Sequence, residues 1–161
     1  MLTVLLWIAG IAVGLVVLYL VVMICAAIYT NMTGIEPKGI EARVVAPATV
    51  RVRDEFDVRI VINNVSDRER VISNVDLSHS FVEFVALKVI EPEPAEQPSG
   101  TPTLGTLVHK FTLLTPSKGS STVTFKFVAM KAGQSRGEFV VYADSNSYRY
   151  LTVPISVIVT E

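Results

Sequence analysis

A chain of 161 residues is large enough for one folded domain with an appendage, and too short for two independent hydrophobic cores. Its formal net charge of −1, with no basic face in the sequence, argues against a nucleic-acid partner. Half of the residues are hydrophobic and the mean hydropathy is +0.49, which is high for a soluble protein. The distribution of the apolar residues therefore decides the class of protein.

The apolar residues are concentrated at the N-terminus, where residues 1–35 contain no charged side chain. A helix over residues 2–29 would rise roughly 42 Å, compared with roughly 30 Å for the hydrocarbon core of a bilayer. Trp7 and Tyr29 lie toward its two ends, where their amphipathic rings suit the membrane interfaces. We therefore predict a transmembrane helix over residues 1–29 of a single-pass protein that contacts the lipid bilayer.

A cleaved signal peptide is the competing interpretation of this segment. Such peptides begin with a basic region and have an apolar stretch of about 7–15 residues, whereas this segment lacks the basic region and is longer. A lipoprotein signal has a small residue before its modified cysteine, but Cys25 follows Met23 and Ile24. Cys25 is also the only cysteine, which excludes a disulfide within the chain. We expect the segment to be retained.

Gly10 and Gly14 lie four residues apart on the predicted helix, with Ala9 and Ala12 nearby. Small residues at this spacing allow a second helix to approach closely. The alternative is a helix that faces only lipid, because the pattern is frequent in apolar segments. We take Gly10 and Gly14 as candidates for packing against other integral-membrane subunits.

Residues 30–39 contain Asn, Thr, two Gly and Pro37, which indicates a short linker before a domain over residues 40–161. In residues 56–63, apolar side chains alternate with Asp57 and other polar residues, as in a strand with one buried face. Weaker or similar patterns predict further strands at residues 41–45, 49–52, 71–77, 84–90, 109–114, 123–127, 139–143 and 151–157.

These eight or nine short strands, without an amphipathic helix, predict an all-β, immunoglobulin-like sandwich of two antiparallel sheets that follows the transmembrane helix. A closed barrel is the alternative. Pro154 cannot donate a hydrogen bond to a neighbouring strand, so we expect the last strand at an edge, or Pro154 facing outward.

Residues 91–105 contain four prolines and two glycines among acidic residues, which predicts an exposed loop. A loop of this length is a candidate contact element, with Glu91, Glu93 and Glu96 as its candidate contact residues. The same three carboxylates could gather a calcium ion, but the prolines among them favour a solvated acidic loop.

The segments "FDVRIVINNVSD", "NVDL" and "LLTPSKGSSTVTFKFVAMKAGQSRGEFVVYA" resemble immunoglobulin-like domains of the CARDB type over residues 42–159. The resemblance implies a module that binds, spaces or scaffolds and has no catalytic residues. This sequence differs from the usual tandem secreted arrangement because it has one copy directly after an apolar helix.

We find no constellation of residues that predicts catalysis, a metal site or a cofactor. His79 and His109 each lie near a predicted strand without a second histidine or a cysteine, so we expect surface or hydrogen-bonded histidines. Ser78, His79 and Ser80 with Glu83 could suggest a triad, but adjacent strand residues point to opposite faces. The sequence therefore predicts a protein that is not an enzyme.

Lys38, Arg43, Arg51 and Arg53 follow the apolar segment and no basic residue precedes it, which favours a domain on the cytoplasmic face of the cell membrane. The periplasmic or extracellular face is the close alternative, because small immunoglobulin-like domains on one anchor more often lie outside. We expect an accessory or scaffolding subunit of a larger integral-membrane complex, for example a respiratory or photosynthetic one. The alternative is a cell-envelope adhesion module that contacts protein or glycan.

Overall fold

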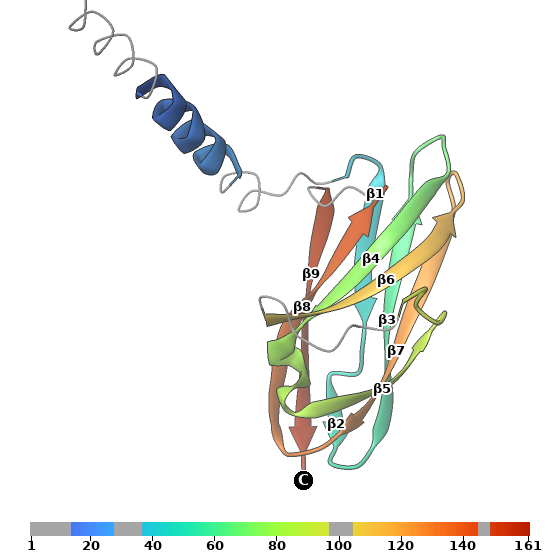
Figure 1. Cartoon of the computed structure of the whole chain (residues 1–161). Coiled ribbons are helices and arrows are strands. Elements are labelled where there is room, and N and C mark those ends of the chain that lie inside the picture. Colours follow the sequence, from blue (N-terminus) through green and yellow to red (C-terminus); the bar gives the residue numbers. More distant parts are fainter. Residues whose placement is uncertain (1–13, 28–36, 97–104, 145–148) are drawn as a thin grey trace, which may run out of the picture. The chain divides into compact units, whose positions relative to one another are not determined.

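The computed structural model in Figure 1 describes residues 14–27, 37–96, 105–144 and 149–161. The chain divides into two compact units, Met1–Ile35 and Glu36–Glu161. The second unit thus begins four residues before the boundary predicted at residue 40.

Residues 14–27 of the first unit are helical, and their apolar side chains are exposed. From Leu15 to Ile24, ten consecutive large apolar side chains are each 50–63% exposed. Gly14 has no atom within 4 Å of the place where a Cβ would lie.

The predicted transmembrane helix over residues 1–29 is not confirmed. Within the described ranges, no helix is both long and apolar enough to cross a membrane. Trp7, Gly10 and Tyr29, on which the predicted anchoring and packing depend, lie outside the described residues.

The described part of the second unit contains nine strands and one 3₁₀ helix. They are β1 (Ile40–Val45), β2 (Thr49–Arg51), β3 (Glu55–Asn64), β4 (Arg70–Ser78), η1 (His79–Glu83), β5 (Val85–Glu91), β6 (Thr106–Thr115), β7 (Ser120–Ala129), β8 (Gly133–Ala143) and β9 (Tyr150–Thr160). One sheet has the order β1-β3-β7-β5 and the other β2-β9-β8-β4-β6. Neighbouring strands are antiparallel except β2 and β9. The predicted β-sandwich is confirmed, and the closed barrel is wrong.

The core lies between the two sheets and is built by strand alternation. In β3, Phe56, Val58, Ile60 and Ile62 are buried, whereas the residues between them are exposed or half-buried. The other fully buried large side chains include four phenylalanines, which are Phe81, Phe125, Phe127 and Phe139. Burial of each large apolar side chain contributes about 1.5–3 kcal/mol, so the alternation that the sequence displays also provides most of the stabilisation.

β-Bulges change the phase of alternation in two strands. In β4 the register shifts between Ile72 and Asn74, after which Val75 and Leu77 face the core. In β5 the register shifts between Leu87 and Val89, so that Leu87 pairs with Phe127 and Ile90 pairs with Phe125, both of which are core residues. The bulges thus determine which side chains of β4 and β5 reach the interior.

Between β4 and β6 the chain crosses from one sheet to the other and back, because β5 lies in the opposite sheet, and β5 and β6 are edge strands. The first crossing, from β4 to β5, passes through η1, which lies against β8 with Phe81 buried. A Cβ at Gly137 of β8 would lie 2.2 Å from Ser78 Oγ and 2.8 Å from Phe81 Cβ. Only glycine therefore permits η1 to lie this close to β8.

Pro154 is exposed and pairs with β8 on one side of β9. On the other side, β2 pairs only with Ile158–Thr160, so β9 is an edge at Pro154. The sequence prediction for this proline is confirmed.

The start of the sandwich is fixed by hydrogen bonds. Arg70 Nη1 donates to the Lys38 carbonyl oxygen at 2.8 Å, and Val65 N donates to the Gly39 carbonyl oxygen at 2.9 Å. The last three residues of the predicted linker, 37–39, therefore belong to the folded domain.

The same end of the sandwich contains a buried amide network centred on Asn64. Its Nδ2 lies within hydrogen-bond distance of the carbonyl oxygens of Arg68 (2.7 Å), Thr115 (3.1 Å) and Pro116 (2.9 Å). Its Oδ1 accepts from the backbone N and the Oγ of Ser66, at 3.1 and 2.6 Å. One side chain thus joins three segments and satisfies their buried polar groups.

Candidate binding pocket between β5 and β6

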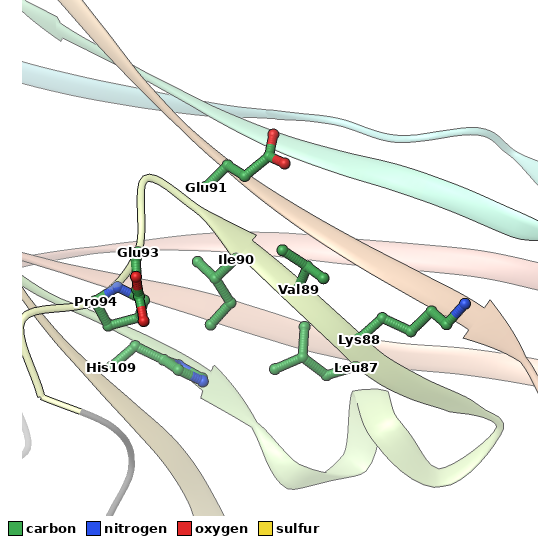
Figure 2. Close-up of a pocket in the computed structure, with 8 residues that line it drawn as sticks. All are labelled: Leu87, Lys88, Val89, Ile90, Glu91, Glu93, Pro94 and His109. Atoms are coloured by element: carbon green, nitrogen blue, oxygen red, sulfur yellow. The ribbon is translucent and has the colours of Figure 1, made fainter.

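A pocket of about 510 Å³ lies between the edge strands β5 and β6 (Figure 2). Its apolar walls are formed by Leu87, Val89 and Ile90 of β5 and by Pro94, which follows this strand. Its volume lies within the range of about 300–1,000 Å³ that is usual for small-molecule sites. The pocket exists because β5 and β6 belong to different sheets and do not pair with each other.

His109 of β6 lines the pocket from the other sheet and is 1% exposed. In Figure 2 its imidazole points toward the side chains of Leu87 and Ile90. The ring lies edge-on to Phe125, with ring centroids 5.5 Å apart and planes at 80°. The imidazole is therefore part of the core and of the pocket wall at once.

The two nitrogens of His109 have different surroundings. Nδ1 lies 3.3 Å from the carbonyl oxygen of Val75, the residue opposite His109 on β4. Nε2 is buried and has no hydrogen-bond partner among the described residues. Burial lowers the pKa of His109 below its usual value of 6.5, against the opposing effect of hydrogen bonds to the backbone of Val75 and Leu107, so the ring is neutral at pH 7. A carbonyl only accepts, so Nδ1 carries the proton and Nε2 presents a lone pair.

Two of the three charged side chains that line the pocket, Lys88 and Glu91, form ion pairs with residues outside it. Lys88 forms an ion pair with Glu55, and Glu91 Oε1 lies 2.7 Å from Lys126 Nζ. The hydrogen bond and charge of Glu91 raise the pKa of Lys126. Glu93, which is exposed, adds one further carboxylate to the rim of the pocket.

The three candidate contact carboxylates occupy different positions. Glu91 is the last residue of β5, and both Glu91 and Glu93 line the pocket. Glu96 instead forms an isolated β-bridge with Lys110 of β6, and its Oε2 lies 2.5 Å from Lys110 Nζ. Of the predicted exposed loop over residues 91–105, Glu91 is instead the end of a strand, residues 92–96 are mostly exposed and cross to β6, and residues 97–104 lie outside the described residues.

The residues considered as a triad lie at the end of β4 and on η1. Ser80 Oγ donates to Ser78 Oγ at 3.3 Å, and Ser78 Oγ also accepts from the backbone N of Glu138 at 2.9 Å. Strand alternation does not apply to His79, Ser80 and Glu83, because residues 79–83 form a 3₁₀ helix. Among the described residues, no group of three His, Cys, Asp or Glu side chains could hold a metal ion.

Asp76 of β4 is a second buried titratable group, and nothing in the sequence pattern marks it as buried. It is 7% exposed and accepts a hydrogen bond from the Tyr142 hydroxyl of β8. Burial raises the pKa of Asp76 from 3.8 to about 6, and burial together with Asp76 raises that of Tyr142 to about 12. The pair lies on the outer face of the sheet, because the neighbouring Val75 and Leu77 face the core.

His109 is predicted to be a surface or hydrogen-bonded histidine, and it is hydrogen-bonded, but its burial is not anticipated. The signal was present in the sequence, since His109 alternates with Phe111 and Leu113 on one face of the predicted strand. The unpaired Nε2 could not have been found in this way, because it depends on which strand lies opposite.

Comparisons with known proteins show the fold and no family. No family model matches the chain, and no curated protein matches it. The chain is similar to a cohesin module from a Clostridium perfringens family 33 glycoside hydrolase, with 14% identity over 78% of this chain and 99% of that one, at a TM-score of 0.52. At this identity the likeness shows a β-sandwich fold alone.

Two other similar structures have TM-scores below 0.5 and support no argument. One is a CARDB domain from Pyrococcus furiosus, with 18% identity over 78% of this chain and 98% of that one, at a TM-score of 0.49. The other is the cupredoxin domain of amoB from Nitrosocaldus yellowstonii, with 9% identity over 79% and 90% of the two chains, at a TM-score of 0.47. The sandwich expected from the CARDB resemblance is confirmed, whereas membership of that family stays a prediction.

Proposed function

We propose that this chain is a non-catalytic, single-pass accessory subunit that stabilises a larger integral-membrane complex by helix packing and by its β-sandwich. The exposed apolar helix is the observation that supports this most directly. Ten consecutive side chains from Leu15 to Ile24 are each at least 50% exposed. Leaving one such side chain in water instead of an apolar environment costs about 1.5–3 kcal/mol. A segment of this kind needs lipid tails or other apolar helices around it.

The fixed start of the sandwich supports a scaffolding role. The uncharged segment ends at residue 35, and the backbone is already held by the domain at Lys38 and Gly39. A short connection of this kind restricts how far the sandwich can move from its anchor. It therefore suits a subunit that braces its partners at the membrane surface.

Mild-detergent purification of the tagged full chain from its own membranes tests the proposal. We expect other integral-membrane proteins to co-purify in a fixed ratio, and mass spectrometry to identify them. The double variant Gly10→Leu, Gly14→Leu should lose them, because leucines on this face prevent close helix packing. Ala12→Leu is the matched control, since its small-to-large change falls on the opposite face of a helix. A chain that purifies alone and monomeric would overturn the proposal.

A cell-envelope binding module is the second candidate, and the pocket beside Glu91 and Glu93 favours it. This function requires the sandwich to lie outside the cytoplasm. In a Cys25→Ala background, Lys118→Cys adds a thiol at a side chain that is 69% exposed. Labelling of intact cells by a membrane-impermeant maleimide would favour the binding module, whereas labelling only after lysis would exclude it.

A further inference from the structure

We propose that the pocket between β5 and β6 binds a small uncharged ligand with an apolar body and one hydroxyl group, of the phenol or alcohol class, which donates a hydrogen bond to Nε2 of His109. The inference does not depend on the proposed accessory role.

The contacts of the His109 imidazole identify Nε2 as the hydrogen-bond acceptor for the ligand. Nδ1 donates to the Val75 carbonyl oxygen, so Nε2 of the neutral ring has a free lone pair. Among the described residues, nothing donates to this atom, although His109 is 1% exposed. A buried acceptor that lacks a donor is costly, so a ligand that supplies one gains the corresponding affinity.

The residues that line the pocket determine the chemical character of the rest of the ligand. Leu87, Val89, Ile90 and Pro94 offer apolar contact in a pocket of about 510 Å³. An apolar molecule with one hydroxyl donor fits both these apolar walls and the buried acceptor Nε2.

The charged groups at the pocket disfavour an ionic ligand. Lys88 and Glu91 are already paired with Glu55 and Lys126, and the carboxylate of the exposed Glu93 repels an anion. A metal ion would have one neutral imidazole and, in the described part of the chain, no cluster of further ligands.

The test uses the full chain in lipid nanodiscs with ¹⁵N-labelled histidine. The chain has two histidines, and His79→Gln identifies the signals of His109. Phenol and toluene are the probes, because toluene has a similar size and no donor. Equilibrium dialysis gives both the same free concentration, which corrects for uptake by lipid.

We expect phenol to cause a saturable change in the ¹⁵N shift of His109 Nε2 and none at His79. Ligand-observed NMR should show toluene binding about 10-fold more weakly, as expected for one lost hydrogen bond to a buried acceptor. In His109→Phe, which keeps an aromatic ring against Phe125, this preference for phenol should disappear.

A second pair of variants separates the pocket from the fold. Val89→Trp fills the pocket from a side chain that is 47% exposed, and should abolish binding of both probes. Leu114→Trp is the matched control on β6, at 53% exposure and outside the pocket, and should bind normally. The proposal is overturned if phenol leaves Nε2 unchanged, if toluene binds as well as phenol, or if Val89→Trp still binds.

Discussion

The buried carboxyl group of Asp76 predicts that the sandwich loses stability as the pH rises, and Asp76→Asn tests this. Asp76 is 7% exposed, and its Oδ1 has no hydrogen-bond partner among the described residues. Burial raises its pKa from 3.8 to about 6, against the opposing effect of the hydrogen bond from Tyr142. At neutral pH the fold therefore holds an ionised carboxylate where it would be more stable with a neutral acid.

The sign of the effect follows from proton linkage. The folded carboxyl group has the higher pKa, so between pH 3.8 and about 6 the folded state binds more protons than the unfolded state. The free energy of unfolding therefore falls as the pH rises through this window. The stabilisation is complete below 3.8 and lost above about 6, and the difference between these values corresponds to about 3 kcal/mol.

Asparagine keeps an oxygen that can accept from Tyr142 and does not ionise. We expect Asp76→Asn to be more stable than the wild type by about 2–3 kcal/mol at pH 8, and the gain to be largely absent at pH 4. Urea denaturation of the full chain in a nonionic detergent, followed by circular dichroism, measures both values. Comparing the two proteins at each pH removes the contribution of His109, whose lowered pKa makes stability rise with pH.

Asp144→Asn is the matched control. Asp144 lies next to Arg70, with Oδ2 at 2.5 Å from Nη2, and the Arg70 guanidinium lowers the pKa of this carboxyl group. This variant should be less stable than the wild type at pH 8, and the difference should shrink as the pH falls below 3.8. Should Asp76→Asn match the wild type at pH 8, or gain equally at pH 4 and pH 8, the reasoning from burial would be refuted.

Three further predictions concern residues that lie in close contact with their neighbours in the fold. Gly137→Ala adds a Cβ that collides with the residues entering η1, so thermal denaturation should show a loss of about 1–3 kcal/mol; an unchanged melting temperature would contradict this close approach. Asn64→Leu leaves buried carbonyl oxygens without their donor and should cost about 2 kcal/mol or more in urea denaturation, whereas the adjacent, half-buried Asn63→Leu should cost less. Tyr142→Phe removes the donor to Asp76 and should raise the pKa of that carboxyl group further in a ¹³C NMR titration; an unchanged pKa would show that the hydroxyl does not act on it.

The positions of all nine strands could be predicted because one face of each is apolar. β3 was found almost to its ends, since Phe56, Val58, Ile60 and Ile62 are all buried. β8 was predicted only from residue 139, yet it begins at Gly133. Its first half carries Arg136 and Glu138 on the outer face and small residues on the inner one, where η1 covers them, so no apolar alternation marks it.

The pocket could not be predicted, because it depends on pairings between distant residues. A β-bulge inserts one extra residue into a strand and so shifts the alternation, but it has no signature in the amino-acid composition. The inward direction of Ile90 therefore follows only from its pairing with β7. The sequence predicts that Glu91, Glu93 and Glu96 belong to one loop. Glu91 instead ends a strand, and Glu96 pairs with Lys110 of β6, because the chain between them crosses from one sheet to the other.

The bulge in β4 also links the two buried titratable groups. Beyond it, Val75 faces the core and Asp76 the outer face, and the carbonyl oxygen of Val75 lies at Nδ1 of His109. A strand that continued in the phase of Ile72 would instead direct the Val75 side chain outward and the Asp76 carboxyl group into the core. One extra residue in β4 thus keeps this carboxylate out of the core that contains the His109 imidazole.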